Sequence, residues 1–229
     1  GKELVSDEGL NWYDYLARVY DPALLIFTTM DPMAEKYYSI SPYAYCGNNP
    51  VKFVDPDGRK VYFAPKVSSQ FKQDFAMAVQ HLNQHGAAGM LAKLESSDNV
   101  YYIAESLNEY SNYNTGNNTI TWASRYGNLT TEAVLLSPTS VLNHEVDHAL
   151  QHDQNPRQQK IDGKKDLSNP YGNKEEERVI TGSEQETAKK LGEIEQDEVT
   201  RKDHGGTLYK MKSSISTEIE EELIIKPRR

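Results

Sequence analysis

The 229-residue sequence contains a single cysteine, Cys46, so it can form neither an intrachain disulfide nor a cysteine-rich zinc site. It has no run near the roughly 20 apolar residues that span a membrane, and it begins without an apolar signal segment. Basic residues are in deficit: 25 lysines and arginines stand against 34 acidic residues, for a formal net charge of -9. Because an acidic chain offers little attraction to phosphates, we expect neither a nucleic acid nor a membrane as partner.

Residues 1–60 differ in composition from the rest of the chain. Turn-forming dipeptides recur in them about every ten residues, and these are Asp21-Pro22, Asp31-Pro32, Ser41-Pro42, Asn49-Pro50 and Asp55-Pro56. Such punctuation predicts short extended segments joined by turns. We therefore expect a small β-module or linker at residues 1–60, followed by a second domain at residues 61–229.

The second domain is expected to mix strands and helices in an α+β fold. Its aromatic and β-branched runs predict strands at residues 61–64, 100–104, 119–123 and 208–209. Helical spacing of apolar residues predicts a helix capped by Ser68 or Ser69 and a short second helix near residue 90. The polar stretch 111–118 is expected to be a loop, and His81 and His85 are expected at the end of a surface helix.

A longer helix is predicted in the second half of the chain. Ser137 is a favourable N-cap and Pro138 a favourable first helical residue, so we expect a helix over residues 138–154. Residues 155–172 are rich in proline, glycine and charge and are expected to form a loop. A further helix is expected over residues 174–192, where Gly182-Ser183 could introduce a break.

The helix predicted over residues 138–154 carries the motif His144-Glu145-Val146-Asp147-His148. Histidines four residues apart share one helix face and lie close enough to bind one metal ion. Neutral imidazole suits Zn²⁺, which lowers the pKa of a bound water to about 7. Glu145 can then accept a proton from that water and pass it to a leaving amine. The pattern predicts His144 and His148 as zinc ligands and Glu145 as the base of a metalloprotease.

The third ligand has to come from another segment. His152 continues the series of histidines, but eight residues of helix place it about 12 Å from His144. A carboxylate on the next helix is expected instead. Glu176 is preferred, because it shares a face with apolar residues three and four positions later; Glu177 and Glu175 remain open.

Three further residues have weaker assignments. His204 is a candidate donor to the oxygen that gains negative charge during hydrolysis, as is Tyr209. Asp147 is expected to be an exposed helix carboxylate, with support of a metal ligand as the alternative.

Residues 9–59 resemble the Rhs (YD-repeat) associated core region. The matching motifs are Gly9-Leu-Asn-Trp-Tyr-Asp-Tyr, Ala17-Arg-Val-Tyr-Asp-Pro22, Thr29-Met-Asp-Pro32, Ser41-Pro-Tyr-Ala-Tyr-Cys-Gly-Asn-Asn-Pro50 and Val54-Asp-Pro-Asp-Gly58. The chain departs from the pattern at Leu16, where the family usually has glycine, and at Leu25-Ile26, where it usually has Gly-Arg. In that family the segment closes a large β-cage and precedes a variable toxin domain. The resemblance therefore implies the C-terminal part of a polymorphic toxin; Asp55 and Asp57, near the family's self-cleavage element, are given no catalytic role.

Residues 99–206 are similar to the HExxH zinc effector proteases of the gluzincin type. The similarity rests on Asn143-His-Glu-Val-Asp-His-Ala-Leu150, Glu176-Glu-Arg-Val-Ile-Thr-Gly182 and Glu184. It implies a zincin-like fold with a small antiparallel sheet. It also implies a secreted effector that acts on a protein in the target-cell cytoplasm, with a cognate immunity protein and the rest of the Rhs cage as partners.

Two other function classes stay open. The chain could be a non-catalytic zinc-binding or interaction module of an Rhs protein, which is disfavoured because a purely structural zinc helix does not need Glu145. It could also be a nuclease toxin tip, which is disfavoured by the acidic charge and by the absence of a His-Asn-His or lysine-rich catalytic pattern.

Overall fold

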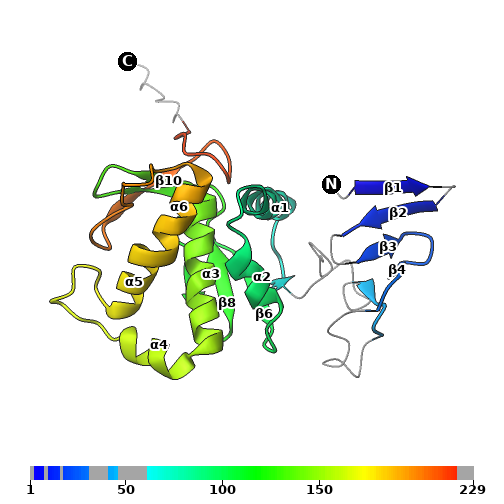
Figure 1. Cartoon of the computed structure of the whole chain (residues 1–229), viewed down its shortest axis with the longest axis horizontal. Helices are drawn as coiled ribbons and strands as arrows, with labels where there is room; N and C mark the ends of the chain where they lie inside the picture. The colour runs from blue at the N-terminus through cyan, green and yellow to red at the C-terminus, as the bar shows by residue number, and fades with distance from the viewer. Residues whose placement is uncertain (1–2, 8–9, 16–17, 31–40, 46–60, 221–229) are drawn as a thin grey trace, which may run out of the picture.

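The computed structural model describes residues 3–7, 10–15, 18–30, 41–45 and 61–220. The expectations for Leu16, Cys46, Asp55 and Asp57 lie outside these ranges. Within them the chain is a mixed α+β protein with small sheets, as predicted (Figure 1). No described helix is both long enough and apolar enough to cross a membrane.

The N-terminal segment forms a four-stranded antiparallel sheet in chain order, drawn in blue at one side of Figure 1. Its strands are β1 (Glu3–Asp7), β2 (Leu10–Asp14), β3 (Val19–Asp21) and β4 (Ile26–Phe27). Phe27 is fully buried, with its ring edge-on to Tyr15 and Tyr20 and the Arg18 guanidinium 3.7 Å from its centroid. The prediction of short extended segments is confirmed where the segment is described.

A second, mixed sheet follows with strand order β5-β6-β8-β7. Its strands are β5 (Val61–Phe63), β6 (Tyr101–Glu105), β7 (Asn112–Asn114) and β8 (Thr119–Trp122). β5, β6 and β8 are parallel, whereas the edge strand β7 runs antiparallel to β8. Alternate residues of β6 and β8 are buried, so one face of the sheet supports the core.

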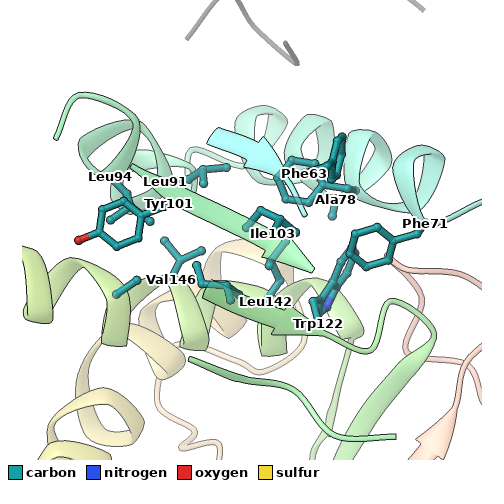
Figure 2. Packing of buried hydrophobic residues seen from close by; sticks show 13 residues of the cluster. Phe63, Phe71, Ala78, Leu91, Leu94, Tyr101, Ile103, Trp122, Leu142 and Val146 are labelled. Atoms are coloured by element: carbon teal, nitrogen blue, oxygen red, sulfur yellow. The ribbon is translucent and has the colours of Figure 1, made fainter. Parts of the chain in front are cut away.

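Three helices pack around that buried face: α1 (Ser69–Gln84), α2 (Gly89–Glu95) and α3 (Pro138–Gln154). Figure 2 shows side chains from the sheet and from these helices meeting in one cluster, with Trp122 at one end and Tyr101 near the other. The Trp122 indole N–H donates to the carbonyl of Pro138 at 2.8 Å, which fixes the start of α3 against the sheet.

The predicted bounds of the helices hold best where a cap is present. Ser68 caps α1 by accepting from the N–H of Phe71 at 3.0 Å, and α3 spans the residues predicted for it, with Ser137 accepting from the N–H of Ser140. His85 caps the end of α1, one turn after His81, as expected.

Two expected loops contain structure. Residues 111–118 include β7, and residues 155–172 include the helix α4 (Pro156–Asp162). Pro156 does end α3, but it also occupies the first position of α4, where its missing N–H costs no hydrogen bond. Both loop predictions are therefore wrong in part.

The region 174–191 is helical throughout: α5 (Lys174–Val179), a π-helical segment η3 (Ile180–Glu184) and α6 (Gln185–Leu191). A wider turn at Gly182 replaces the predicted break. A third sheet, with order β10-β9-β11, consists of β9 (Tyr126–Thr130), β10 (Leu135–Leu136) and β11 (Gly206–Lys210). Of these strands only β11 was predicted.

Candidate metal centre

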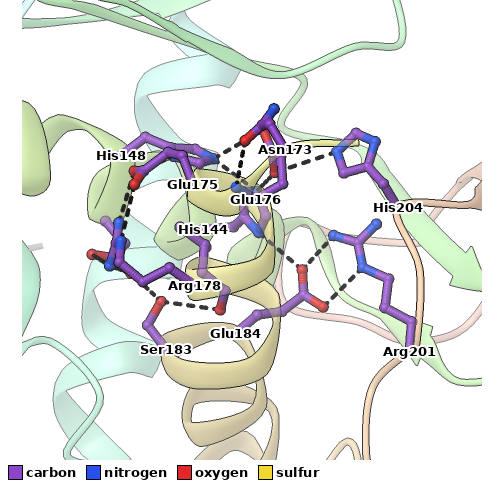
Figure 3. A network of polar contacts seen from close by, with 12 residues as sticks. His144, His148, Asn173, Glu175, Glu176, Arg178, Ser183, Glu184, Arg201 and His204 are labelled. Carbon is purple, nitrogen blue, oxygen red and sulfur yellow. Dashed lines mark hydrogen bonds and ion pairs between the residues drawn. The ribbon is translucent and has the colours of Figure 1, made fainter. Parts of the chain in front are cut away.

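Three potential ligands from two helices converge on one point. The Nε2 atoms of His144 and His148, both on α3, lie 3.1 Å apart. The carboxylate of Glu176, on α5, faces both rings, with Oε2 3.3 Å from Nε2 of His144 and Oε1 3.4 Å from Nε2 of His148 (Figure 3). One ligand atom from each residue lies within 4.8 Å of the others.

The donor atoms of this cluster fit a divalent cation. The Nδ1 atom of each histidine faces a carboxylate, Glu184 for His144 and Glu175 for His148, at 2.9 and 3.0 Å. An N–H at Nδ1 leaves the lone pair of Nε2 directed toward Glu176. The buried Oε2 atom of Glu176 accepts no hydrogen bond from the described residues. Two imidazole nitrogens with free lone pairs and a carboxylate oxygen that accepts no hydrogen bond form a set of ligands typical of zinc.

Glu184 contacts the Nδ1 atom of His144 on the side of the ring that faces away from the cluster. It is 2% exposed, lies at the end of η3, and accepts hydrogen bonds from Thr200 at 2.7 Å and from Nε of Arg201 at 3.0 Å. A single wider turn of this kind often occurs at functional sites. Here it ends on the carboxylate that orients the first histidine.

Glu175 holds His148 in the same way. Arg178 donates to Glu175 at 2.8 Å and to Asp147 at 3.0 Å, and Ser183 donates to Asp147. Asp147 is 6% exposed, so the expectation of an exposed carboxylate is wrong. Its charge is compensated by an arginine 31 residues later, a partner that the helix pattern alone does not indicate.

The electrostatics of the cluster favour positive charge. Burial alone would lower the pKa of His144, but the Glu176 and Glu184 carboxylates outweigh it and raise that pKa to about 9. Burial likewise acts against the charged form of His148, yet Glu175 and Glu176 raise its pKa to about 10. For Glu176, burial is overcome by the surrounding histidines, which hold its pKa well below the usual range. Surroundings that stabilise protonated histidines also attract a dication.

Glu145 lies beside the three ligands, 8% exposed, on the floor of the same cleft. Burial raises its pKa, while the neighbouring His144 and His148 act in the opposite direction. The backbone N–H of Tyr113, in β7, faces this carboxylate and also acts to lower its pKa. The residue predicted as the base is thus placed between the ligand cluster and the edge of the mixed sheet.

The other predicted site residues separate into two groups. His204 reaches the cluster: its Nε2 atom lies 3.3 Å from Oε2 of Glu176, and its side chain is 54% exposed at the cleft. Glu177 accepts instead from Asn169 at 2.7 Å and is outside the cluster. Tyr209 pairs with Gly127 in the third sheet and does not line the cleft.

The cluster forms the floor of a cleft with a volume of about 840 Å³. One wall is the segment around β7, and another is α4; His204 also lines the cleft. His152, too far along α3 to join the cluster, contacts the hydroxyl of Tyr113 through Nδ1 at 2.7 Å. That contact ties the edge strand to the helix that bears both histidines.

Sequence reasoning did not assign the residues that support the ligands. Arg178, Thr200 and Arg201 carry no motif of their own, and Glu184 was named only through a resemblance. The available signal was the spacing of three residues between Glu175 and Arg178, which commonly forms an ion pair on a helix.

Comparisons with known proteins leave the family open. No family model matches the chain, and no solved structure matches it. Among curated proteins, salivary gland surface protein 1 of Aedes aegypti is 51% identical over 59 residues, covering 26% of this chain and 2% of that protein. Because the match spans so small a share of that protein, it supplies no function for this chain.

Replacing Glu184 with glutamine is expected to weaken zinc binding by roughly 10- to 100-fold, since it removes the charged partner of the His144 N–H. Competition with a chromophoric chelator measures the effect. Glu186→Gln, an exposed carboxylate on the next helix, is the control and should bind zinc like the unmodified protein. Equal affinities for both variants, with unchanged melting temperatures, would show that Glu184 does not support a metal ligand.

Proposed function

We propose that residues 61–229 are a zinc-dependent endopeptidase of the gluzincin type with a zincin-like fold. The proposal rests on one observation: His144, His148 and Glu176 converge on the floor of a cleft that also contains Glu145. A metal site with a purely structural role is usually closed by protein ligands, whereas this cluster faces an open cleft.

The protein's own groups have distinct roles in this proposal. His144, His148 and Glu176 would hold the ion, and a bound zinc ion supplies a Lewis acid that polarises a carbonyl and acidifies water. Glu145 accepts the proton of the attacking water and delivers it to the nitrogen of the leaving amine. Glu175 and Glu184 keep the two imidazoles oriented.

The position of β7 supports a peptide as the substrate. β7 is the edge of its sheet, and the N–H of Tyr113 reaches Glu145 from it. An extended peptide can pair with an exposed edge strand through main-chain hydrogen bonds. A peptide bound along β7 would therefore have its carbonyl groups close to Glu145.

His204 is proposed to stabilise the charge that develops on the substrate carbonyl oxygen. It lies beside Glu176 and is exposed to the cleft. An imidazole N–H placed there can donate to an oxyanion.

The wider biological role is proposed from sequence resemblance. The Rhs-like segment supports an effector that is delivered from a larger cage protein and cleaves a protein in the target-cell cytoplasm. Such a toxin requires a cognate immunity protein in the producing cell. We expect expression in a bacterial cytoplasm to stop growth.

Mapping of new N-termini tests the proposed activity. The zinc-loaded protein is incubated with a denatured bacterial protein extract, and new N-termini are labelled and identified by mass spectrometry. We expect new termini that disappear when zinc is removed with a chelator and return when zinc is restored. Identical sets of termini with and without the protein would favour the non-catalytic module.

A further inference from the structure

One face of α4 forms part of the wall of the cleft. Four residues of this helix and its C-cap line the cleft, namely Pro156, Arg157, Gln159, Lys160 and the C-cap Gly163. Their spacing of one, three, four and seven residues is that of a single helical face. Figure 1 shows α4 crossing the end of α3, next to α5.

A buried hydrogen bond fixes the orientation of this face. Gln159 is 7% exposed, and its side-chain N–H donates to the backbone carbonyl of His148 at 2.6 Å. Arg157 and Lys160 flank Gln159 on the same face. The hydrogen bond therefore fixes the positions of Arg157 and Lys160 relative to His148.

Arg157 and Lys160 are the permanently charged cations among the residues that line the cleft. Neither has an ion pair with any carboxylate in the described parts of the chain, and both are exposed. In contrast, Arg178 and Arg201 are fully engaged with carboxylates behind the cluster. The cations on α4 are thus available to a molecule in the cleft.

The acidic groups of the cleft do not neutralise these cations. Glu175 is paired with Arg178, and the negative charges of Glu145 and Glu176 match the charge of one dication. Charges of the chain that lie farther than about 8 Å from this wall are largely screened at physiological salt. The wall formed by α4 remains positive at short range.

We propose that this wall selects peptides with acidic side chains at alternate positions close to the scissile bond. Arg157 and Lys160 are three residues apart, which places their Cβ atoms about 5–6 Å from each other. Residues two apart in an extended peptide lie on one side of it, about 7 Å apart. A Glu-x-Glu segment bound along α4 matches both the charge and the spacing. This inference deepens the proposed peptidase and rests on its peptide-binding cleft.

Binding to an inactive protein tests the inference separately from catalysis. The zinc-loaded Glu145→Gln variant is titrated against two fluorescein-labelled pools of 12-residue peptides, measured by fluorescence anisotropy. The pools are identical in their randomised positions and differ only in a central Glu-x-Glu or Gln-x-Gln. We expect the acidic pool to bind about tenfold more tightly, with a preference that shrinks as salt rises.

Charge removal on α4 identifies the residues responsible. Adding Arg157→Gln and Lys160→Gln should reduce the preference severalfold, whereas adding Lys66→Gln and Lys93→Gln, two exposed lysines outside the cleft, should preserve it. Equal binding of both pools, or a preference that the α4 changes leave unchanged, overturns the inference.

Cleavage of the same pools by the protein with Glu145 intact separates this inference from the proposed function. Preferred cleavage of the acidic pool supports both, and equal cleavage of both pools overturns the acidic selection alone. If neither pool is cleaved, the peptidase proposal fails, while the binding comparison still decides whether α4 selects acidic peptides.

Discussion

Replacing Glu145 with glutamine is expected to lower kcat/KM for peptide hydrolysis by at least about a hundredfold, the usual contribution of a positioned general base. Glutamine keeps the size of the side chain and its capacity to accept a hydrogen bond. It cannot accept a proton from water at neutral pH. Because Glu145 is not among the three potential ligands, the variant should retain one zinc per chain.

Initial rates on a peptide found by terminus mapping, together with zinc content by mass spectrometry, measure both effects. Glu195→Gln is the control, since Glu195 is exposed and does not line the cleft. The same pair of variants applies to the growth assay, in which Glu145→Gln should lose toxicity and Glu195→Gln should keep it. A Glu145→Gln variant that cleaves at the normal rate would contradict the role of base.

Replacing Glu176 with glutamine is expected to give the largest loss of zinc affinity at any carboxylate. The change removes the negative charge that faces both Nε2 atoms. The loss should exceed the roughly 10- to 100-fold effect expected for the supporting Glu184, because a direct ligand is altered. Activity should fall in parallel and recover in part at high zinc concentration.

Glu177→Gln is a matched control for this prediction. The two residues are adjacent on α5, but Glu177 contacts Asn169 and lies outside the cluster. Zinc titrations monitored by a competing chelator should show normal affinity for Glu177→Gln. If Glu177→Gln loses zinc and Glu176→Gln does not, the third ligand proposed here is wrong.

The parts of the site predicted from sequence are those with a local signal. Ser137 and Pro138 set the start of α3, and the spacing of the two histidines then places both on one face. Glu176 was preferred because it precedes apolar residues on its own face. Val179 and Ile180 are fully buried, and Glu176 does point toward α3.

The parts that were missed depend on pairing between segments: the neighbouring strand for β7, and residues far along the chain for Asp147 and His144. Residues 112–114 read Asn-Tyr-Asn, a run too short to establish a strand period, and β7 exists because its backbone pairs with β8. The burial of Asp147 depends on Arg178, and the support of His144 depends on Arg201. These partners are separated by tens of residues, so no helical or strand period reveals them.

The N-terminal part illustrates a different limit. The turn dipeptides correctly predicted short strands in the described ranges. The Rhs resemblance, in contrast, concerns a large cage, whose assembly a local sequence pattern does not encode. The same holds for substrate and delivery, because pocket shape and partners are properties of the folded assembly.

An anomalous difference map, calculated from diffraction data that are collected at the zinc absorption edge, tests the central claim most directly. We predict a single peak per chain, at a position where a zinc ion would be coordinated by Nε2 of His144, Nε2 of His148 and the carboxylate of Glu176. A peak on other side chains, or no peak in crystals grown with zinc, would contradict both the ligand set and the peptidase built on it.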